Sequence, residues 1–221
     1  MALMATLVTV RPASADVSWT DWTSAVPSGG PGAISGVMGV INVTYAGDYL
    51  SLVTNYPSWT PAGSYTDGVL VPNAPPPADN IIQLVGGNPD VNTVSFSAPV
   101  TNPVMAIWSL GSGGNPAVFV FQNAAPTIVA GGPSAEYHGA SITPIFNGVA
   151  GAEGNGTVEF VGTFNSISWT NPESEYWYGF TVGMGGGTPA VPEPSSLLLL
   201  GIFAGAVSLG ARRFGWNAGR R

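Results

Sequence analysis

Apolar and polar residues alternate over short runs in the central part of the chain, and clusters of glycine and proline separate these runs. In Val104–Leu110, Trp108 and its alternate neighbours fall on one face of an extended strand, and Met105 and Ile107 fall on the other. Both faces are apolar, which is typical of a strand inside a sandwich. No window of a dozen residues between 16 and 186 shows a helical apolar stripe free of glycine and proline.

Short strands at this spacing predict an all-β fold, a single β-sandwich or jelly-roll-like domain over residues 16–182. The predicted strands are Val17–Trp22, Val37–Tyr45, Ile81–Val85, Val91–Phe96, Val104–Leu110, Ala117–Phe121, Thr127–Val129, Thr157–Thr163, Ser166–Trp169 and Tyr178–Val182.

Two segments flank this domain. Residues 1–15 begin with a short apolar stretch, reach Arg11-Pro12 where that stretch should continue, and end in Ala13-Ser14-Ala15, a small-x-small site of the signal-peptidase kind; the basic start of a signal peptide is missing. They predict a signal peptide whose true start lies upstream of Met1. Residues 183–190 are rich in glycine and predict a flexible linker.

Charge is scarce and strongly segregated. Charged residues make up 8% of the chain, against about 25% in typical soluble domains. All twelve acids lie between Asp16 and Glu193, and residues 16–194 contain neither lysine nor arginine. Nucleic-acid binding needs lysine and arginine to displace counterions, so the composition excludes a nucleic-acid partner.

The sequence shows no pattern typical of a cofactor site or of nucleophilic catalysis. The chain has no cysteine, which removes disulfides and thiolate metal sites, and its one histidine, His138, lies in no nucleophile-elbow pattern. The sequence therefore predicts no catalytic residue and no resident cofactor. Calcium stays open as a ligand, because the carboxylates have no lysine or arginine partners in the domain, but no EF-hand pattern supports it.

The C-terminal segment 191–221 has three parts in a fixed order. Val191-Pro192-Glu193-Pro194 is a short stiff motif, Ser195–Ala211 has no charge, and Arg212-Arg213 begin the basic tail 212–221. This order resembles the PEP-CTERM sorting signal. The resemblance implies an exosortase, a membrane-embedded cysteine protease, as the processing partner, and an exported protein that is released or transferred to the surface.

Elementary geometry agrees with a membrane-spanning helix over 195–211. Seventeen helical residues span about 25 Å, and snorkelling by Arg212 and Arg213 covers the remaining distance across the ~30 Å hydrocarbon core. The positive-inside rule leaves these arginines in the cytoplasm and the outer domain across the membrane. A plain anchor that is never cleaved is the alternative reading.

Aromatic residues gather near the end of the domain. Trp169, Tyr176, Trp177 and Tyr178 lie close to Asn171, and exposed aromatic faces stack on sugar rings. If 176–178 is extended, Trp177 points opposite to its two tyrosine neighbours. The four rings are therefore candidates for ligand binding, with packing in the core as the alternative.

These observations favour a non-catalytic cell-surface or extracellular-matrix protein of a Gram-negative-type bacterium. We expect it to be anchored transiently in the membrane, processed by an exosortase and associated with exopolysaccharide, as in a biofilm. A carbohydrate-binding module is the second reading. A polysaccharide hydrolase is the third, because Glu173 and Glu175 offer paired carboxylates.

Overall fold

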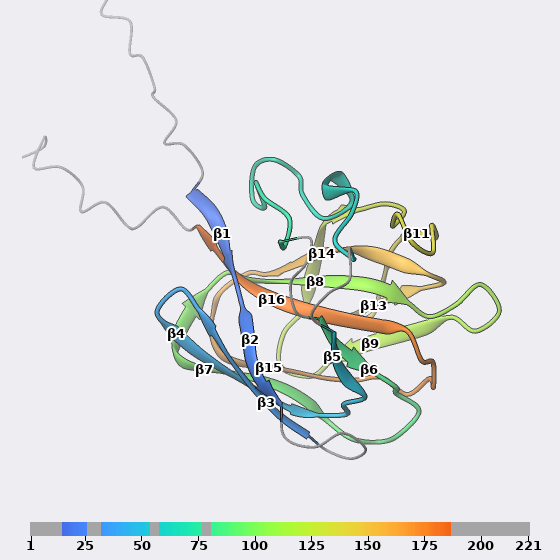
Figure 1. The fold of residues 1–221 in the computed structure, drawn as a ribbon, viewed down its shortest axis with the longest axis horizontal. Helices are drawn as coiled ribbons and strands as arrows, with labels where there is room; N and C mark the ends of the chain where they lie inside the picture. Colours follow the sequence, from blue (N-terminus) through green and yellow to red (C-terminus); the bar gives the residue numbers. More distant parts are fainter. Residues whose placement is uncertain (1–14, 26–31, 54–57, 77–80, 187–221) are drawn as a thin grey trace, which may run out of the picture. The chain divides into compact units, whose positions relative to one another are not determined.

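The computed structural model describes residues 15–25, 32–53, 58–76 and 81–186. Within these ranges the chain forms β-strands and one short 3-10 helix, η1 (Ala62–Ser64). The strands build two sheets (Figure 1). The all-β prediction is confirmed. None of the described residues belongs to a helix long and apolar enough to cross a membrane, and the predicted span 195–211 lies outside them.

The first sheet is antiparallel apart from one short parallel pair, β11 with β14. Its strands in order are β10 (Pro126–Gly131), β14 (Gly154–Phe160), β8 (Pro103–Leu110), β16 (Tyr178–Gly186), β6 (Ile81–Leu84) and β5 (Ser51–Val53), with β1 (Ala15–Trp19) beside β16 and β11 (Ala140–Ser141) beside β14.

The second sheet is antiparallel throughout its described pairs. Its strands in order are β12 (Thr143–Ile145), β13 (Gly148–Gly151), β9 (Ala117–Phe121), β15 (Thr163–Thr170), β7 (Asn92–Thr101), β4 (Ile41–Gly47), β3 (Gly32–Met38) and β2 (Asp21–Ala25).

Side chains from both sheets meet in one hydrophobic core. Trp169 on β15 packs edge-on against Phe180 on β16, with 4.9 Å between ring centroids, and lies 5.7 Å from the ring of Phe119 on β9. The indole N–H of Trp22 on β2 donates to Thr181 Oγ1 on β16 at 3.1 Å. These contacts between the sheets give the domain a sandwich-like arrangement.

A second apolar cluster covers the outer face of the first sheet. Val104, Ala106 and Trp108 of β8 pack there with Trp59 and Tyr65 of segment 58–76. Met105 and Ile107 of the same strand enter the main core. The prediction that β8 is apolar on both faces is confirmed, and the reason is that β1 and segment 58–76 cover its outer side.

Two predicted strands prove to be pairs of strands. The run Val37–Tyr45 is a hairpin, because Gly39, at φ +62°, turns the chain between β3 and β4. The run Val17–Trp22 crosses from the first sheet to the second at Thr20, whose N–H and hydroxyl both donate to the Val182 carbonyl. Four short strands, β5, β11, β12 and β13, were not predicted.

The linker prediction begins too early, because β16 continues to Gly186. Gly183 and Met184 pair with β8 on one side and β1 on the other. A Cβ at Gly183 would lie 2.6 Å from Val17 Cγ1 and 2.8 Å from Trp19 Cε3. Glycine is required there by packing, and residues 187–190 lie outside the described residues.

Candidate functional site

The predicted aromatic group divides into two buried and two exposed rings. Trp169 and Tyr178 are fully buried in the core between the sheets, whereas Tyr176 is 63% exposed and Trp177 45% exposed. The alternation expected for an extended 176–178 does not occur, because the chain bends at 176–177 and becomes a strand only at Tyr178. The candidate ligand surface therefore reduces to Tyr176 and Trp177.

The loop that carries these two rings, residues 171–177, joins β15 to β16 and is held by its backbone. The Glu175 N–H donates to the Val85 carbonyl at 2.8 Å. The Gln83 side-chain amide donates to the Tyr176 carbonyl at 2.5 Å.

Side chains fix the other half of the same loop. The Asn115 amide donates to the Ser174 carbonyl at 2.7 Å, and Glu173 Oε2 accepts the Val118 N–H at 3.1 Å. These hydrogen bonds hold the loop backbone in the position that leaves the rings of Tyr176 and Trp177 exposed. Two neighbouring aromatic faces on a fixed loop are suited to stacking against a flat apolar surface such as a sugar ring.

A buried polar network lies at the base of this loop. The Asn92 side-chain amide donates to Asn171 Oδ1, and the Asn171 amide donates to the Tyr178 hydroxyl at 2.7 Å. The hydroxyl of Tyr45 lies 2.5 Å from Asn92 Oδ1, which also accepts the Asp48 N–H at 2.9 Å. The network joins the end of β4 to the facing ends of β7, β15 and β16.

Asp48 supplies the charge in this network. Its Oδ2 accepts the N–H groups of Val85, at 3.1 Å, and of Gly86. Gly86 lies at φ +66°, and a Cβ there would overlap the hydroxyl of Tyr178. Burial, with the Asp48 charge adding to it, raises the pKa of Tyr45 well above its usual value. These groups are enclosed, so the arrangement supports structure and offers no reactive group to a substrate.

Sequence reasoning missed this polar network. The sequence does contain a sign of the network: the pairs Gly47-Asp48 and Gly86-Gly87 each follow directly after a mostly apolar run. A glycine within or at the end of a strand often marks a place where another backbone approaches closely. The partners Asn92 and Asn171 are distant in sequence, and only the fold brings them together.

Ser109 and Glu153 form a second polar contact, at 2.5 Å between Oγ and Oε2. Both residues adopt left-handed backbone, with φ of +53° and +58°. Such conformations persist where the surrounding structure fixes them. Asn155 does so here, since its Oδ1 accepts the Ser109 N–H and its amide donates to the Glu153 carbonyl. Ser109 is buried, and the side chain of His138 is exposed.

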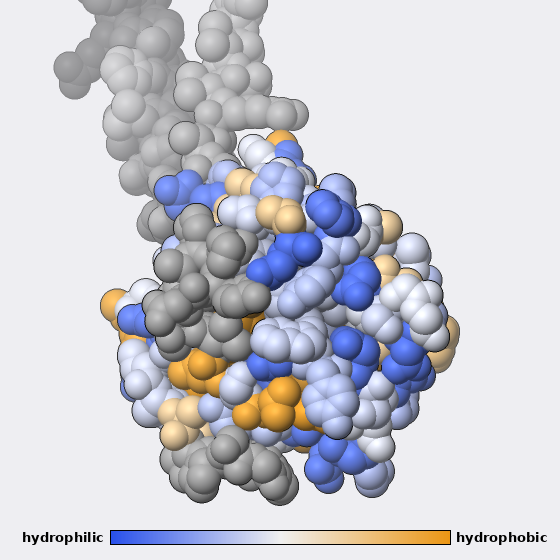
Figure 2. Space-filling view, turned by 45° about the vertical axis from the view of Figure 1, so that its right-hand side comes forward, coloured by the Kyte–Doolittle hydropathy of each residue, from blue (hydrophilic) through white to orange (hydrophobic). Residues whose placement is uncertain are grey.

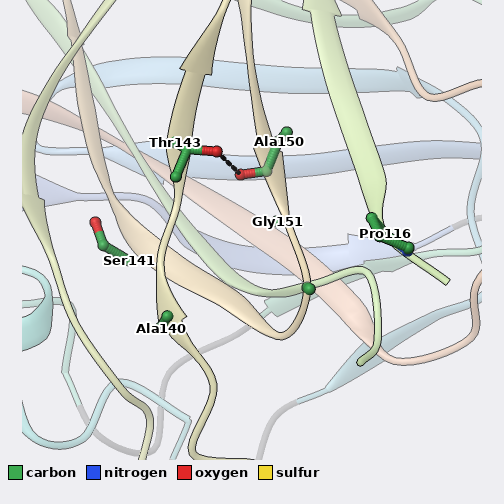
Figure 3. Close-up of a pocket in the computed structure, with 7 residues that line it drawn as sticks. Pro116, Ala140, Ser141, Thr143, Ala150 and Gly151 are labelled. Carbon is green, nitrogen blue, oxygen red and sulfur yellow. Dashed lines mark hydrogen bonds between the residues drawn. The ribbon is translucent and has the colours of Figure 1, made fainter. Parts of the chain in front are cut away.

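A hollow of about 290 Å³ opens beside the β12–β13 hairpin (Figure 3). The Thr143 hydroxyl donates to the Ala150 carbonyl across its wall at 3.4 Å. No residue in its lining carries a charge or titrates near neutral pH, so the hollow has no acid or base for hydrolysis. The lining residues are Pro116, Ala140, Ser141, Thr143, Ala150, Gly151 and Ala152.

Within the described ranges, no three histidine, aspartate or glutamate side chains lie close enough together to hold a metal ion. Calcium therefore stays an untested prediction from composition. The face in Figure 2 is dominated by hydrophilic and weakly polar residues, with apolar residues in small patches. This agrees with a surface built from uncharged polar side chains.

The comparison with protein families matches the C-terminal segment. Residues 190–213 match the family model described as the PEP-CTERM protein-sorting motif. The chain carries a PEP-CTERM motif. The predicted motif residues Val191, Pro192, Glu193 and Pro194 and the basic pair Arg212 and Arg213 all fall within the match, and all lie outside the described residues.

The PEP-CTERM motif marks an exported protein with a C-terminal sorting signal and implies an exosortase as its processing partner. The recognition made from the sequence is confirmed. The comparison with curated proteins found no match, and the comparison with solved structures found none either.

Burial raises the pKa of Glu175 above its usual value of 4.5, although N–H donation from Trp177 and Tyr176 opposes the shift. Burial also raises the pKa of Glu159, and the charge of Asp67 adds to that rise. The folded state therefore binds these protons more tightly than the unfolded chain. The contribution of these two groups to stability is fully present below about pH 4.5 and is lost as pH rises through their raised pKa values.

We expect the melting temperature to be higher at pH 5 than at pH 7, and Glu175→Gln to flatten this dependence. Asp67 titrates below this pH range. Burial raises its pKa, but hydrogen bonds from backbone N–H groups outweigh burial and leave the pKa below its usual value of 3.8. Asp16→Asn, at an exposed position, is the matched control. Identical pH profiles for wild type and Glu175→Gln would contradict the assignment.

Proposed function

We propose that this protein is a non-catalytic component of the cell surface or extracellular matrix, released from its membrane anchor by an exosortase and associated with exopolysaccharide. The observation that carries the proposal is the sorting motif at residues 190–213, placed directly after an all-β domain.

The amino-acid composition of the domain suits a protein that is exported from the cell. Residues 16–194 have no lysine or arginine and no cysteine, so the domain needs neither disulfide formation nor ion pairing to fold. Its excess of carboxylates keeps copies apart through self-repulsion until salt or divalent cations screen it. Such a domain tolerates delivery into a hydrated polysaccharide layer.

Processing is the first test. The intact mass of protein recovered outside cells should lack the residues after about Pro194, because an extended, proline-stiffened motif suits a protease. Glu193→Ala/Pro194→Ala should leave the protein full-length and in the membrane fraction. Asn217→Ala, beyond the matched residues, should be processed like wild type. Recovery of extracellular protein that still carries Arg221 would refute the sorting proposal.

Carbohydrate binding is the second candidate, and the exposed pair Tyr176 and Trp177 favours it. The two rings project from an anchored loop, so little backbone entropy is lost when a ligand stacks on them. One or two stacking contacts support weak binding only. Firm attachment to a polymer would then come from many copies along one strand.

We expect Trp177→Ala and Tyr176→Ala to weaken retention on the cell's own exopolysaccharide by about tenfold each, by analogy with the ~1–3 kcal/mol of aromatic stacking on nucleobases. Phe146→Ala is the matched control, since Phe146 is 90% exposed at the tip of the β12–β13 hairpin. Equal retention of all three folded variants and wild type would rule out the platform.

A further inference from the structure

The two described ends of the chain lie side by side. β1, the first strand, pairs antiparallel with β16, the last, through Ala15 with Gly186 and Trp19 with Gly183 (Figure 1). Because the pairing is antiparallel, the chain enters the domain and leaves it at the same end. Any segment before residue 15 and any segment after residue 186 therefore starts from one place on the domain surface.

Three turns share this end with the two strand termini. A Cβ at Gly39 would lie 3.8 Å from both Met184 and Ser18. The N–H of Asn102 donates to the Gly162 carbonyl at 2.7 Å, and Asn102 Oδ1 accepts the Gly162 N–H at 2.8 Å. We call this surface the exit end. It consists of residues 15–18, 39–41, 101–103, 161–163 and 184–186.

The exit end combines exposed apolar tips with almost no charge. Val40 is 91% exposed and Val161 68% exposed. Asp16 is the one acid among the residues of the exit end. Glu159 lies two residues before Val161, and Asp21 lies opposite Val37, two residues before Gly39. All formally charged side chains of residues 16–186 are carboxylates, so an end that carries a single acid is repelled only weakly by an anionic surface.

Chain length limits how far the exit end stands from a membrane. Four residues, 187–190, separate Gly186 from Val191, and the apolar span begins at Ser195. A fully extended chain covers roughly 3.3–3.6 Å per residue, so the chain from Gly186 to Ser195 is at most about 32 Å long.

We propose that the exit end rests on the lipid surface while residues 195–211 are inserted, with Val40 and Val161 entering the headgroup region. This inference rests on the proposed function, since it requires the sorting tail to be a membrane segment. Moving the valine side chains of the turn tips from water into the headgroup region lowers their free energy, as it does for the apolar faces of interfacial helices. The domain then stands on its exit end, with the loop carrying Tyr176 and Trp177 at the opposite end of β16.

The absence of cysteine from the chain makes the test direct. Single Val40→Cys and Val161→Cys variants of the full chain are labelled with a polarity-sensitive fluorophore and inserted into vesicles that contain phosphatidylglycerol and a lipid-borne quencher. Val91→Cys is the matched control. It is also an exposed valine, but it precedes β7 at the end remote from Asn102, roughly 35 Å away at the rise of a strand.

The expected result is a blue shift and loss of most of the fluorescence at positions 40 and 161, with position 91 unchanged. Equal signals at all three positions, in vesicles that carry the protein, would overturn the proposal. So would a shift that appears only in membranes containing the exosortase, because the contact would then be with the enzyme. Flotation of the full chain with the vesicles is scored separately, and failure to float would instead refute the membrane-tail proposal.

Discussion

Replacing Trp169 with alanine is expected to lower the free energy of unfolding by about 3–5 kcal/mol, the range for removing a large buried aromatic side chain. Trp169 is fully buried and contacts the rings of Phe119 on its own sheet and Phe180 on the facing one. Such a loss is a large share of the ~5–15 kcal/mol that stabilises a typical domain. Equilibrium urea unfolding followed by circular dichroism measures it.

Trp177→Ala is the matched control for this prediction. Trp177 is exposed and lies eight residues further along the chain, so its removal creates no cavity and is expected to change stability by less than about 0.5 kcal/mol. Trp169→Phe keeps a ring in the core and should fall between the two, because the Trp169 indole N–H has no hydrogen-bond partner to lose. Equal losses for Trp169→Ala and Trp177→Ala would show that the core is assigned wrongly.

Replacing Asp48 with alanine is expected to cost about 3 kcal/mol, although Asp48 is a short side chain on a loop. Its carboxylate accepts hydrogen bonds from Val85 and Gly86, and hydrogen bonds to charged groups contribute about 1.5–3 kcal/mol each without adding fully. Asn171 would also lose an acceptor, at 3.4 Å. The substitution leaves several buried donors without partners at once.

Asp48→Asn separates shape from charge, since an amide oxygen keeps an acceptor in the same position and should recover part of the lost stability. Asp90→Ala, at an exposed site, should have little effect. If Asp48→Ala unfolds at the same urea concentration as Asp90→Ala, the network does not stabilise the loop that carries Tyr176 and Trp177. The structural role assigned to the network would then be wrong.

The sequence was most informative where function is carried by a linear segment. The motif Val191–Pro194, the uncharged span 195–211 and Arg212-Arg213 are recognised as consecutive residues, and the family match at 190–213 confirms the recognition. A sorting signal of this kind is read as an extended chain and a hydrophobic length. Both properties are local, so no tertiary contact was needed to find them.

The β class was also determined locally. Glycine and proline interrupt every helical stripe in residues 16–186, and alternating apolar runs predict strands. In β8 the pattern even gave the correct division of side chains, with Met105 facing the core between the sheets and Trp108 facing outward. Periodicity could not show what covers the outward face, because segment 58–76 has no regular pattern of its own.

Two glycines, Gly39 and Gly183, have roles that the sequence pattern did not predict, and the physical reason is the same for both. Gly39 and Gly183 have the same composition signal, yet the first makes a turn at positive φ and the second lies in a strand packed against Trp19. Whether a glycine serves conformational freedom or close packing depends on its neighbours in space. The hairpin β3–β4 and the true end of β16 were therefore beyond local reasoning.

The candidate ligand surface and the exit end were decided by tertiary structure alone. Trp169 and Tyr178 are buried between the sheets, whereas Tyr176 and Trp177 are exposed. All four are aromatic and close together in the sequence, so the sequence pattern could not separate the core rings from the surface rings. The pairing of β1 with β16 joins residues about 170 positions apart, a contact set by sheet topology rather than by either strand's sequence. The sequence by itself determined the β class and the export route of this protein, whereas non-local packing determined which surfaces it presents.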